Sequence, residues 1–422
     1  MKTNSHGLSS LEPGAPHQGA KDHAQGSLPD SGFGPVGTLF RLSLLRSILT
    51  ILLILAAFFG HGHLLQAGEE TGWKRALLPQ PMVFPRDHHS HPDYKTEWWY
   101  FTGNLEAEGL GPVGFQFTLF RQGILPPGAD IPDSAWASRA LGFGHAALSF
   151  PQKEKFHFGQ VLERGTFDTA KFPPPPPEKS EQPVLLASVK DWKVELLPDG
   201  SFHLRADIDG HAMDLIARPV VTTVLQGKDG LSQKAAGEGN ASYYYSIPRL
   251  ETTGTITSGG KIHAARGLSW LDREWASNQL GPEQVGWDWF ALHLDDGRDL
   301  MVYRMRLRDG GTDPHSHGSL REKDGTVRHL ALEDFELTPG RTWRSPHTGG
   351  QYPVEWTLKV PQAGIDMKIT AAQKDQELAL EPVSYYEGSV RATPVDGARS
   401  PGGIGYMELT GYARPLEALR SR

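Results

Sequence analysis

The sequence predicts an all-β protein built from antiparallel hairpins, and its 422 residues are enough for two domains. After residue 70, short runs of alternating apolar and polar residues are separated by turn signals such as Asp-Gly. Few windows have a helical period, and the best of them is 371–380. Successive hairpins without crossover helices favour barrels or sandwiches over parallel sheets.

Composition excludes several classes of function. The net charge of −7 and the absence of a basic patch argue against a nucleic-acid partner. The chain has no cysteine, which excludes disulfides, zinc–thiolate sites, thiol nucleophiles and a lipid anchor on cysteine. No serine-hydrolase elbow, P-loop or dinucleotide-binding fingerprint occurs, and the sequence therefore predicts no cofactor.

The first 67 residues are predicted to be a disordered segment followed by a signal peptide or a signal anchor. Arg41 and Arg46 precede the apolar run Ile48–Phe59, as in a secretory signal, with cleavage expected near Ala67. If the apolar segment is extended to 42–65, it is long enough for an uncleaved, tilted anchor. A true start downstream of Met1 is a further alternative. In each case we expect the folded part outside the cytoplasm, either periplasmic or secreted.

The first strand expected in the folded part lies within Asp87–Leu105. Alternation places Trp98 and Tyr100 on one face and Trp99 and Phe101 on the other. Aromatic residues on both faces indicate a strand that is covered on both sides.

Hairpins follow along the chain. Lys190–Pro219 contains three alternating runs separated by turns at Asp199-Gly200 and Asp209-Gly210. The Gly-, Lys- and Ser-rich segment Gln226–Ala241 is expected to be a mobile loop.

The second half echoes the first and ends in a hairpin. Trp287–Phe290 can be aligned with Trp98–Phe101, and each is followed by an apolar strand ending in arginine. By itself, an echo of this length can arise by chance in a β protein. The last two strands, Ser384–Arg391 and Ile404–Tyr412, are expected to pair across a Pro/Gly-rich loop.

A histidine-rich turn precedes the first strand. His89 and His91 are spaced to point to one side, and imidazole with carboxylate suits zinc or copper. The alternative is a solvated loop whose His and Asp side chains cap the strand. No third ligand can be identified, so these two residues are candidates only and no metal is predicted.

The segment Ser269–Trp275 is the best candidate for chemistry. As a strand it places Trp270, Asp272 and Glu274 on one face. Two carboxyls beside an indole in an apolar site make a general acid, because burial and like charge both raise a carboxyl pKa. The alternative is that Arg273 forms structural ion pairs with them at an interdomain seam. Further polar residues within predicted strands are expected to be mostly scaffold residues: Glu97, His145, Asp288, His293, Glu387 and Glu408.

An ordered set of motifs resembles the AttH/CrtC family, which includes carotenoid 1,2-hydratases and proteins described as predicted secreted hydrolases. The motifs are TEWWYFTGNL (96–105), FQFTLFR (115–121), GHAALSF (144–150), YYYSIPRL (243–250) and DREW (272–275). The resemblance covers roughly Phe84 to Tyr412. It implies two tandem lipocalin-like β-barrels, at 75–260 and 265–420, and with it we interpret the internal echo as two related barrels.

The resemblance also implies residue roles. Asp272 takes the part of the proton donor, with Glu274 behind it and with Trp270 and Tyr245 beside it. Ligand-binding residues carried over or placed nearby are Trp98, Tyr100, His145, Trp270, Tyr243 and Tyr245. Where the hydratases have a His and a Trp in the preceding motif, this chain has three tyrosines at 243–245. This departure favours the secreted, non-carotenoid branch.

Three functions remain open from the sequence. The first is an extracytoplasmic carrier of a lipophilic small molecule, with membrane association through 42–65. The second is an enzyme that hydrates, isomerises or cyclises an apolar substrate, using Asp272. The third is a structural interaction module of the cell envelope. The first two predict a wide apolar cavity, and the second also requires Asp272 to be exposed in it.

Overall fold

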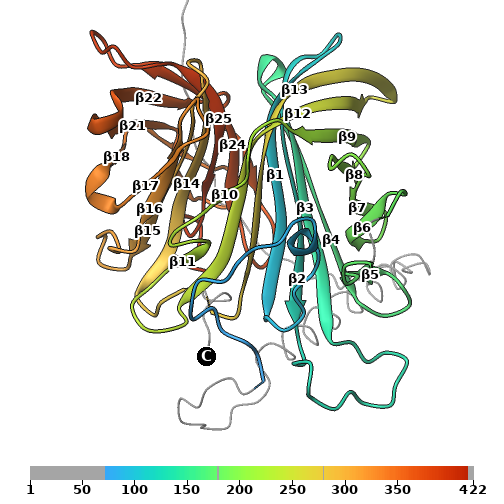
Figure 1. Ribbon diagram of the computed structural model, residues 1–422. Coiled ribbons are helices and arrows are strands. Elements are labelled where there is room, and N and C mark those ends of the chain that lie inside the picture. The colour runs from blue at the N-terminus through green and yellow to red at the C-terminus, as the bar shows by residue number, and fades with distance from the viewer. Residues whose placement is uncertain (1–71, 178–179, 279, 417–422) are drawn as a thin grey trace, which may run out of the picture. The chain divides into compact units, whose positions relative to one another are not determined.

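The computed structural model describes residues 72–177, 180–278 and 280–416, and within them the chain is all-β, as predicted (Figure 1). The helices in this part are short 3₁₀ turns: η1 (Arg86–His88), η2 (Pro151–Lys153), η3 (Leu332–Asp334) and η4 (Pro361–Ala363). None of them is long and apolar enough to cross a membrane. The predictions for the signal segment, the 42–65 anchor and cleavage near Ala67 lie outside the described residues.

Thirteen strands form the first sheet, which is a nearly closed barrel. Its strands are β1 (Thr96–Ala107), β2 (Gly111–Gly123), β3 (Ala140–Phe150), β4 (Lys155–Arg164), β5 (Ala170–Lys171), β6 (Val184–Val189), β7 (Trp192–Leu196), β8 (Phe202–Ile208), β9 (His211–Pro219), β10 (Val224–Leu225), β11 (Leu231–Gln233), β12 (Ala241–Ser258) and β13 (Lys261–Ala276). They pair in the order β4-β3-β2-β1-β13-β12-β9-β8-β7-β6-β5, while β10 and β11 pair with β12.

The turns between β7, β8 and β9 lie where Asp-Gly and its neighbours predicted them. Gly200 and Gly210 adopt φ of +85° and +80°, a region that glycine enters without a Cβ penalty. The inner face of this sheet forms one apolar core around Trp99, Phe101 and Trp275. The outer face of β1 carries Trp98 and Tyr100, and the predicted alternation of this strand is therefore confirmed.

Ten strands form the second sheet, a half-barrel that begins after β13 has ended at Ala276. Its strands are β14 (Gln284–Leu294), β15 (Asp299–Leu307), β16 (His317–Arg321), β17 (Val327–Leu330), β18 (Glu336–Pro339), β21 (Glu355–Val360), β22 (Ile365–Ala371), β23 (Glu377–Leu378), β24 (Tyr385–Pro394) and β25 (Gly403–Leu409). The order is β17-β16-β15-β14-β25-β24-β22-β21-β18, with β23 on β24; β19 (Thr342–Arg344) and β20 (Gln351–Pro353) pair separately.

The two sheets have the same topology. In each, four successive strands form a meander (β1 to β4 and β14 to β17), and the last strand returns to pair with the first (β13 with β1, β25 with β14). The echoing segments Trp98–Phe101 and Trp287–Phe290 occupy the first strand of each meander, and the predicted final hairpin is β24 with β25. The internal echo therefore marks a structural repeat.

Segment 371–380, the best of the few windows with a helical period, is not helical and contains the end of β22 and the short strand β23, in agreement with the all-β prediction. One local prediction is wrong. The segment Gln226–Ala241 was expected to be a mobile loop, yet it pairs with β12 through β11 and buries Ser232 and Lys234. Lys234 is buried because Glu274 offers it a counter-charge, a contact that composition does not reveal.

Candidate active site at the seam between the sheets

The outer face of the first sheet packs against the second sheet along a buried aromatic cluster, which we call the seam. Its buried members are Tyr100, Tyr244, Trp270, Leu280, Trp289, Ala291, Met301, Tyr303, Met305, Tyr406 and Leu416. The two inner faces form cores of their own, separate from this cluster. Residues that are far apart in sequence thus meet at a third apolar region.

Asp272 lies in the middle of the first sheet's contribution to the seam. The pairing register sets it opposite Tyr100 of β1 on one side and Ser246 of β12 on the other. Its side chain is 4% exposed. The Tyr244 and Ser246 hydroxyls each donate to it over 2.5 Å, and the Trp270 indole N–H donates over 2.7 Å.

Asp272 forms no ion pair among the described residues, so no positive charge offsets the cost of burying its carboxylate. Burial raises the pKa of Asp272 to about 7, and the nearby charge of Glu274 contributes in the same direction. The three hydrogen bonds oppose this rise without cancelling it. Both protonation states are therefore populated near neutral pH, which is what a general acid or base requires.

Glu274 does have a cation. The Lys234 ammonium lies 3.2 Å from its carboxylate and also lies over the rings of Tyr244 and Tyr303, at 4.7 and 4.6 Å from their centroids. Burial alone would lower the pKa of Lys234, but the Glu274 carboxylate outweighs it and raises that pKa. We therefore assign Glu274 and Lys234 as a buried ion pair beside Asp272.

The second sheet contributes two more carboxyls to the seam. Glu387 of β24 and Glu408 of β25 are directly opposite one another in the pairing register. The Tyr100 hydroxyl donates to Glu387 over 3.0 Å, and the Trp287 indole N–H donates to Glu408 over 2.9 Å. Burial raises the pKa of Glu408 to about 7 and raises that of Glu387 well above its ordinary value.

A row of aromatic side chains continues along the outer face of β1, β2 and β3. Phe120 stacks on Phe143 at 4.5 Å and lies 6.3 Å from Trp98, and all three are partly exposed. The row ends at His145, whose Nδ1 lies 2.7 Å from the Tyr385 hydroxyl of the second sheet. Burial lowers the pKa of His145 to about 3, so it is neutral at physiological pH.

The sequence analysis put Tyr245 beside Asp272, and this is wrong: the tyrosine that contacts Asp272 is Tyr244. Tyr243 and Tyr245 point into the core of the first barrel, on the opposite side of β12. There the Tyr243 hydroxyl donates to the carbonyl of Leu78, and the Tyr245 hydroxyl lies 2.6 Å from Nδ1 of His88. The sequence could have shown this, because Tyr244 shares its alternation with Ser246 and not with Tyr245.

Arg273 also points into the first barrel, and it forms no ion pair with Asp272 or Glu274. Its guanidinium pairs with Glu97, lies 3.9 Å from the centroid of the Trp99 ring, and is fully buried. Glu97 in turn pairs with Arg121. Burial would raise the pKa of Glu97, but the two guanidinium groups hold it well below its usual range. This network is structural, and it lies on the face that the seam does not use.

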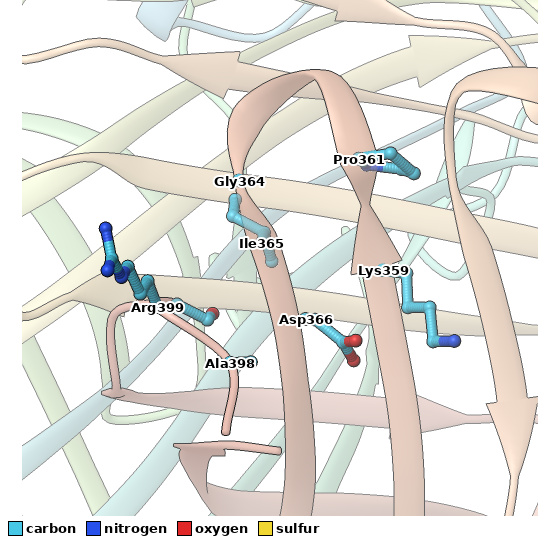
Figure 2. A pocket seen from close by; sticks show the side chains of 8 residues that line it. Lys359, Pro361, Gly364, Ile365, Asp366, Ala398 and Arg399 are labelled. Carbon is cyan, nitrogen blue, oxygen red and sulfur yellow. The ribbon is translucent and has the colours of Figure 1, made fainter. Parts of the chain in front are cut away.

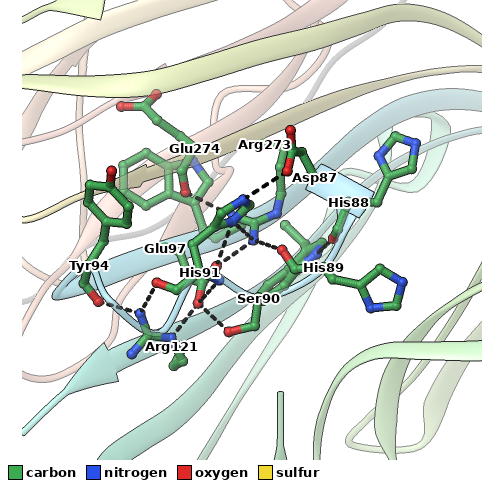
Figure 3. Close-up of polar contacts among 12 residues, drawn as sticks. Asp87, His88, His89, Ser90, His91, Tyr94, Glu97, Arg121, Arg273 and Glu274 are labelled. Atoms are coloured by element: carbon green, nitrogen blue, oxygen red, sulfur yellow. Dashed lines mark hydrogen bonds and ion pairs between the residues drawn. The ribbon is translucent and has the colours of Figure 1, made fainter. Parts of the chain in front are cut away.

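The histidine-rich turn closes over this network (Figure 3). His91 stacks on Trp275 with ring centroids 3.8 Å apart, and its backbone N–H donates to Glu97. Figure 3 shows the rings of His88 and His89 pointing away from His91, so the three imidazoles do not converge. In the part of the chain that the structure describes, no group of three or more His, Asp and Glu side chains could hold a metal ion.

One surface hollow lies away from the seam. It has a volume of about 310 Å³ and is formed at the hairpin of β21 and β22 (Figure 2). Its lining residues are Lys359, Pro361, Gly364, Ile365, Asp366, Ala398, Arg399 and Ser400. None of them belongs to the seam, and the hollow is not used in the functional argument.

A family model described as AttH-like matches residues 75–412. The chain belongs to the AttH-like family. The resemblance found from the sequence motifs is therefore confirmed. The crystal structure of an AttH candidate from Nitrosomonas europaea matches with a TM-score of 0.71 at 34% identity, over 80% of this chain and 99% of that chain.

Other relatives of this AttH-like chain carry the names of hydro-lyases. The crystal structure of kievitone hydratase from Nectria haematococca has a TM-score of 0.56 at 17% identity and covers 79% of this chain and 94% of its own. This likeness shows the fold. The dehydratase asqC of Emericella nidulans is 24% identical over 206 residues, which are 44% of this chain and 55% of that protein. The match thus spans little more than half of the curated relative.

Proposed function

We propose that this chain binds a lipophilic small molecule in the seam and adds water to it, or removes water from it, by acid–base chemistry at Asp272. The observation that supports this most is the state of Asp272, a carboxyl among aromatic rings with a pKa of about 7 and no cation of its own. Such a group can protonate an isolated alkene and can accept the proton back in the reverse direction.

The surroundings of Asp272 suit the cationic intermediate of that reaction. Trp270 and Trp289 lie edge to face, with centroids 6.3 Å apart, and Tyr100 lies 5.3 Å from Trp289. Aromatic faces attract positive charge through their quadrupoles and at the same time bind apolar chains. The names of the two hydro-lyase relatives support the same reaction class.

The enzyme hypothesis required Asp272 to be exposed in a wide apolar cavity, but the structure buries this side chain, so access to it requires the seam to open. Asp272 is 4% exposed, whereas Trp98, Trp287 and Val383 at the border of the cluster are partly exposed. We place the entry there, next to the row of aromatic side chains on β1, β2 and β3. Glu408, which is also partly exposed, lies on the same side.

The test uses linalool, a tertiary allylic alcohol, and myrcene, the corresponding alkene, as probes. We expect the protein to interconvert them and the Asp272→Asn variant to do so about 10²–10⁴ times more slowly. Asp214→Asn, which changes an aspartate of β9 in ion pairs with His203 and Arg205, is the matched control and should keep the wild-type rate. An Asp272→Asn variant that is as active as the control would refute the role of Asp272.

A non-catalytic carrier is the second candidate, and the hydrogen bonding of Asp272 favours it. Both of its carboxylate oxygens already accept hydrogen bonds within the protein. A carrier should quench the fluorescence of seam tryptophans on binding N-phenyl-1-naphthylamine and leave the terpenoid probes unchanged. Binding that Trp289→Ala abolishes, without turnover by the wild type, would favour the carrier.

We further propose that the protein acts outside the cytoplasm and that the segment 42–65 directs its export or holds it on the membrane. This rests on the basic flank, the apolar run and the small residues that follow it. Fractionation of cells should place the protein in the membrane or extracytoplasmic fraction. Full-length protein in the cytoplasmic fraction would contradict both alternatives.

A further inference from the structure

The structural repeat gives Asp272 a counterpart in the second sheet. Asp272 lies on the last strand of its sheet, opposite Tyr100 of the first strand. Glu408 also lies on the last strand of its sheet, opposite Trp289, which the repeat aligns with Tyr100. Both carboxyls accept from an indole N–H, Trp270 for Asp272 and Trp287 for Glu408. The repeated topology thus has one carboxyl on each side of the seam.

Asp272 and Glu408 differ in the residue that lies opposite them on the neighbouring strand. Asp272 faces Ser246 on β12, whereas Glu408 faces a second carboxyl, Glu387, on β24. Side chains that are directly opposite in antiparallel strands have Cβ atoms about 5 Å apart. Among the described residues, neither glutamate forms an ion pair with Lys, Arg or His. Two adjacent carboxyls in a largely apolar site without a counter-ion do not both ionise near neutral pH.

Two oxygen atoms beside this pair have no hydrogen-bond partner within the described residues. They are Oε1 of Glu387 and the hydroxyl of Tyr406, whose residues are 0% and 1% exposed. Tyr406 lies on the same face of β25 as Glu408, and the charge of Glu387 contributes to raising the pKa of Tyr406. An acceptor and a hydroxyl that are both buried and unsatisfied indicate that a small polar group binds there.

We propose that Glu387 and Glu408 form a second acid–base group, a carboxyl pair that shares one proton and, with Tyr406, binds the oxygen that is added to or removed from the substrate. This rests on the proposed function of the seam and deepens it. Asp272 then handles the proton on carbon, and the pair handles the proton on oxygen.

The proton transfers balance in both dehydration and hydration. In dehydration, the pair donates its proton to the hydroxyl, the C–O bond breaks and water leaves. The carbocation then loses a C–H proton to the Asp272 carboxylate, and the C=C bond forms. In hydration, Asp272 protonates the alkene carbon, water bonds to the cation, and the pair accepts a proton from that water. Each turnover moves one proton between the two groups, and it returns through solvent at the partly exposed Glu408.

Titratable side chains from several strands face the pair of Glu387 and Glu408. Tyr100 comes from β1, Tyr385 and Tyr406 from the second sheet, and the carboxyls of Asp272 and Glu274 from β13. Burial raises the pKa of Glu408 most, and the charges of Asp272 and Glu274 raise it further.

The first test needs no ligand. Infrared difference titration follows the carbonyl band of protonated carboxyls in the wild type, Glu387→Gln and Glu408→Gln, each in the full chain. If the proton is shared, removing either carboxyl relieves like-charge repulsion, and the remaining one titrates at lower pH than the pair does. Glu355→Gln, which removes an ion-paired glutamate of the same sheet, is the control and should leave the titration unchanged. If each glutamine variant loses one carbonyl band and the remaining carboxyl titrates at the same pH as in the wild type, the two carboxyls do not share a proton.

The second test separates the pair from Asp272. Linalool in ¹⁸O-labelled water exchanges its oxygen when the C–O bond breaks and re-forms, whether or not a C–H proton is lost. We expect Asp272→Asn to retain ¹⁸O exchange while alkene formation falls, and Glu387→Gln and Glu408→Gln to lose both by about 10²-fold or more. Wild-type exchange rates in both glutamine variants would overturn the pair's role.

The outcomes of the two tests distinguish a failure of the proposed reaction from a failure of the carboxyl pair. If the wild type acts on neither linalool nor myrcene, the proposed reaction fails for this substrate class, and the infrared titration still decides whether the pair shares a proton. If Asp272→Asn is fully active while the glutamine variants are not, the role of Asp272 fails and the pair stands.

Discussion

The carboxyls on the two faces of the sheets contrast in what lies beside them. Glu97 and Asp288 face the inside of their sheets and pair with arginines, so each is a fixed negative charge in an ion pair. Asp272 and Glu408 face the seam and accept hydrogen bonds from hydroxyl and indole groups, without an ion pair among the described residues. Burial raises the pKa of Asp272 and of Glu408 to about 7, because no cation opposes it there, whereas Arg121 and Arg273 hold the pKa of Glu97 well below its usual range.

The stability of the protein should depend on pH through Asp272. Its folded-state pKa of about 7 lies above the ordinary 3.8, so the folded state holds the proton more tightly than the unfolded state does. The resulting stabilisation is complete below about pH 4 and is lost as pH rises through 7, with an upper bound of about 4 kcal/mol. Asp272→Asn lacks this dependence. Its free energy of unfolding in urea should therefore improve relative to the wild type between pH 5 and pH 8.

The buried histidines contribute equally to the wild type and to Asp272→Asn. His88 and His145 have pKa values of about 3 and favour the folded state as pH rises, but they are present in both proteins. A difference in unfolding free energy that stays constant from pH 5 to pH 8 would show that Asp272 titrates outside this range.

The Glu97 network should prove structural. Glu97→Gln leaves two buried guanidinium groups with a neutral partner, and we expect it to cost about 3–5 kcal/mol in unfolding free energy. Glu251→Gln, which removes an exposed ion pair with Arg218, should cost less than about 1 kcal/mol. Similar effects of the two variants in urea denaturation would contradict the structural assignment.

Alternation along one strand is readable from sequence, and pairing between distant strands is not. The faces of Trp98, Tyr100, Trp270, Asp272 and Glu274 were predicted, because side chains in a strand alternate with a period of two. Tyr244 was missed, although alternation along β12 sets it on the face of Ser246; that this face meets Asp272 follows from the pairing of β12 with β13. Glu387 and Glu408 were named among polar residues of predicted strands that were expected to be mostly scaffold residues, because nothing local placed these two on the seam.

At the scale of single elements, hairpins were the easiest feature to predict and β11 was the hardest. Asp-Gly turns have a local cause in the backbone conformation of glycine. The segment around β11 has the composition of a loop, and it is ordered by contacts from elsewhere. Besides the Lys234–Glu274 ion pair, Ser232 lies 3.0 Å from Nε2 of His317 in the second sheet.

The Lys234–Glu274 ion pair should anchor β11. Lys234→Ala or Glu274→Ala leaves a buried charge unpaired, and each should cost about 3–5 kcal/mol. The double variant should cost less than the sum, since it leaves no unpaired charge. Limited proteolysis within 226–241 should be faster in each single variant than in the wild type. Additive energies in this double-mutant cycle would contradict the ion pair.

At the scale of the molecule, two sheets with the same strand topology share a buried surface to which both contribute. The fold class, the tandem repeat and the family were accessible from the sequence, because alternation, turns and motifs are local. The seam was not, because it depends on how two outer faces meet. The strongest candidates for function, Asp272 and the pair of Glu387 and Glu408, lie on opposite sides of that surface.

A crystal structure of the protein with bound linalool tests the central claim most directly. We expect the ligand between the sheets, in contact with Asp272 on one side and Glu408 on the other, with Trp98 and Trp287 moved to admit it. Linalool inside the first barrel beside Tyr245 and Trp99, or in the hollow at the hairpin of β21 and β22, with the seam closed, would contradict it.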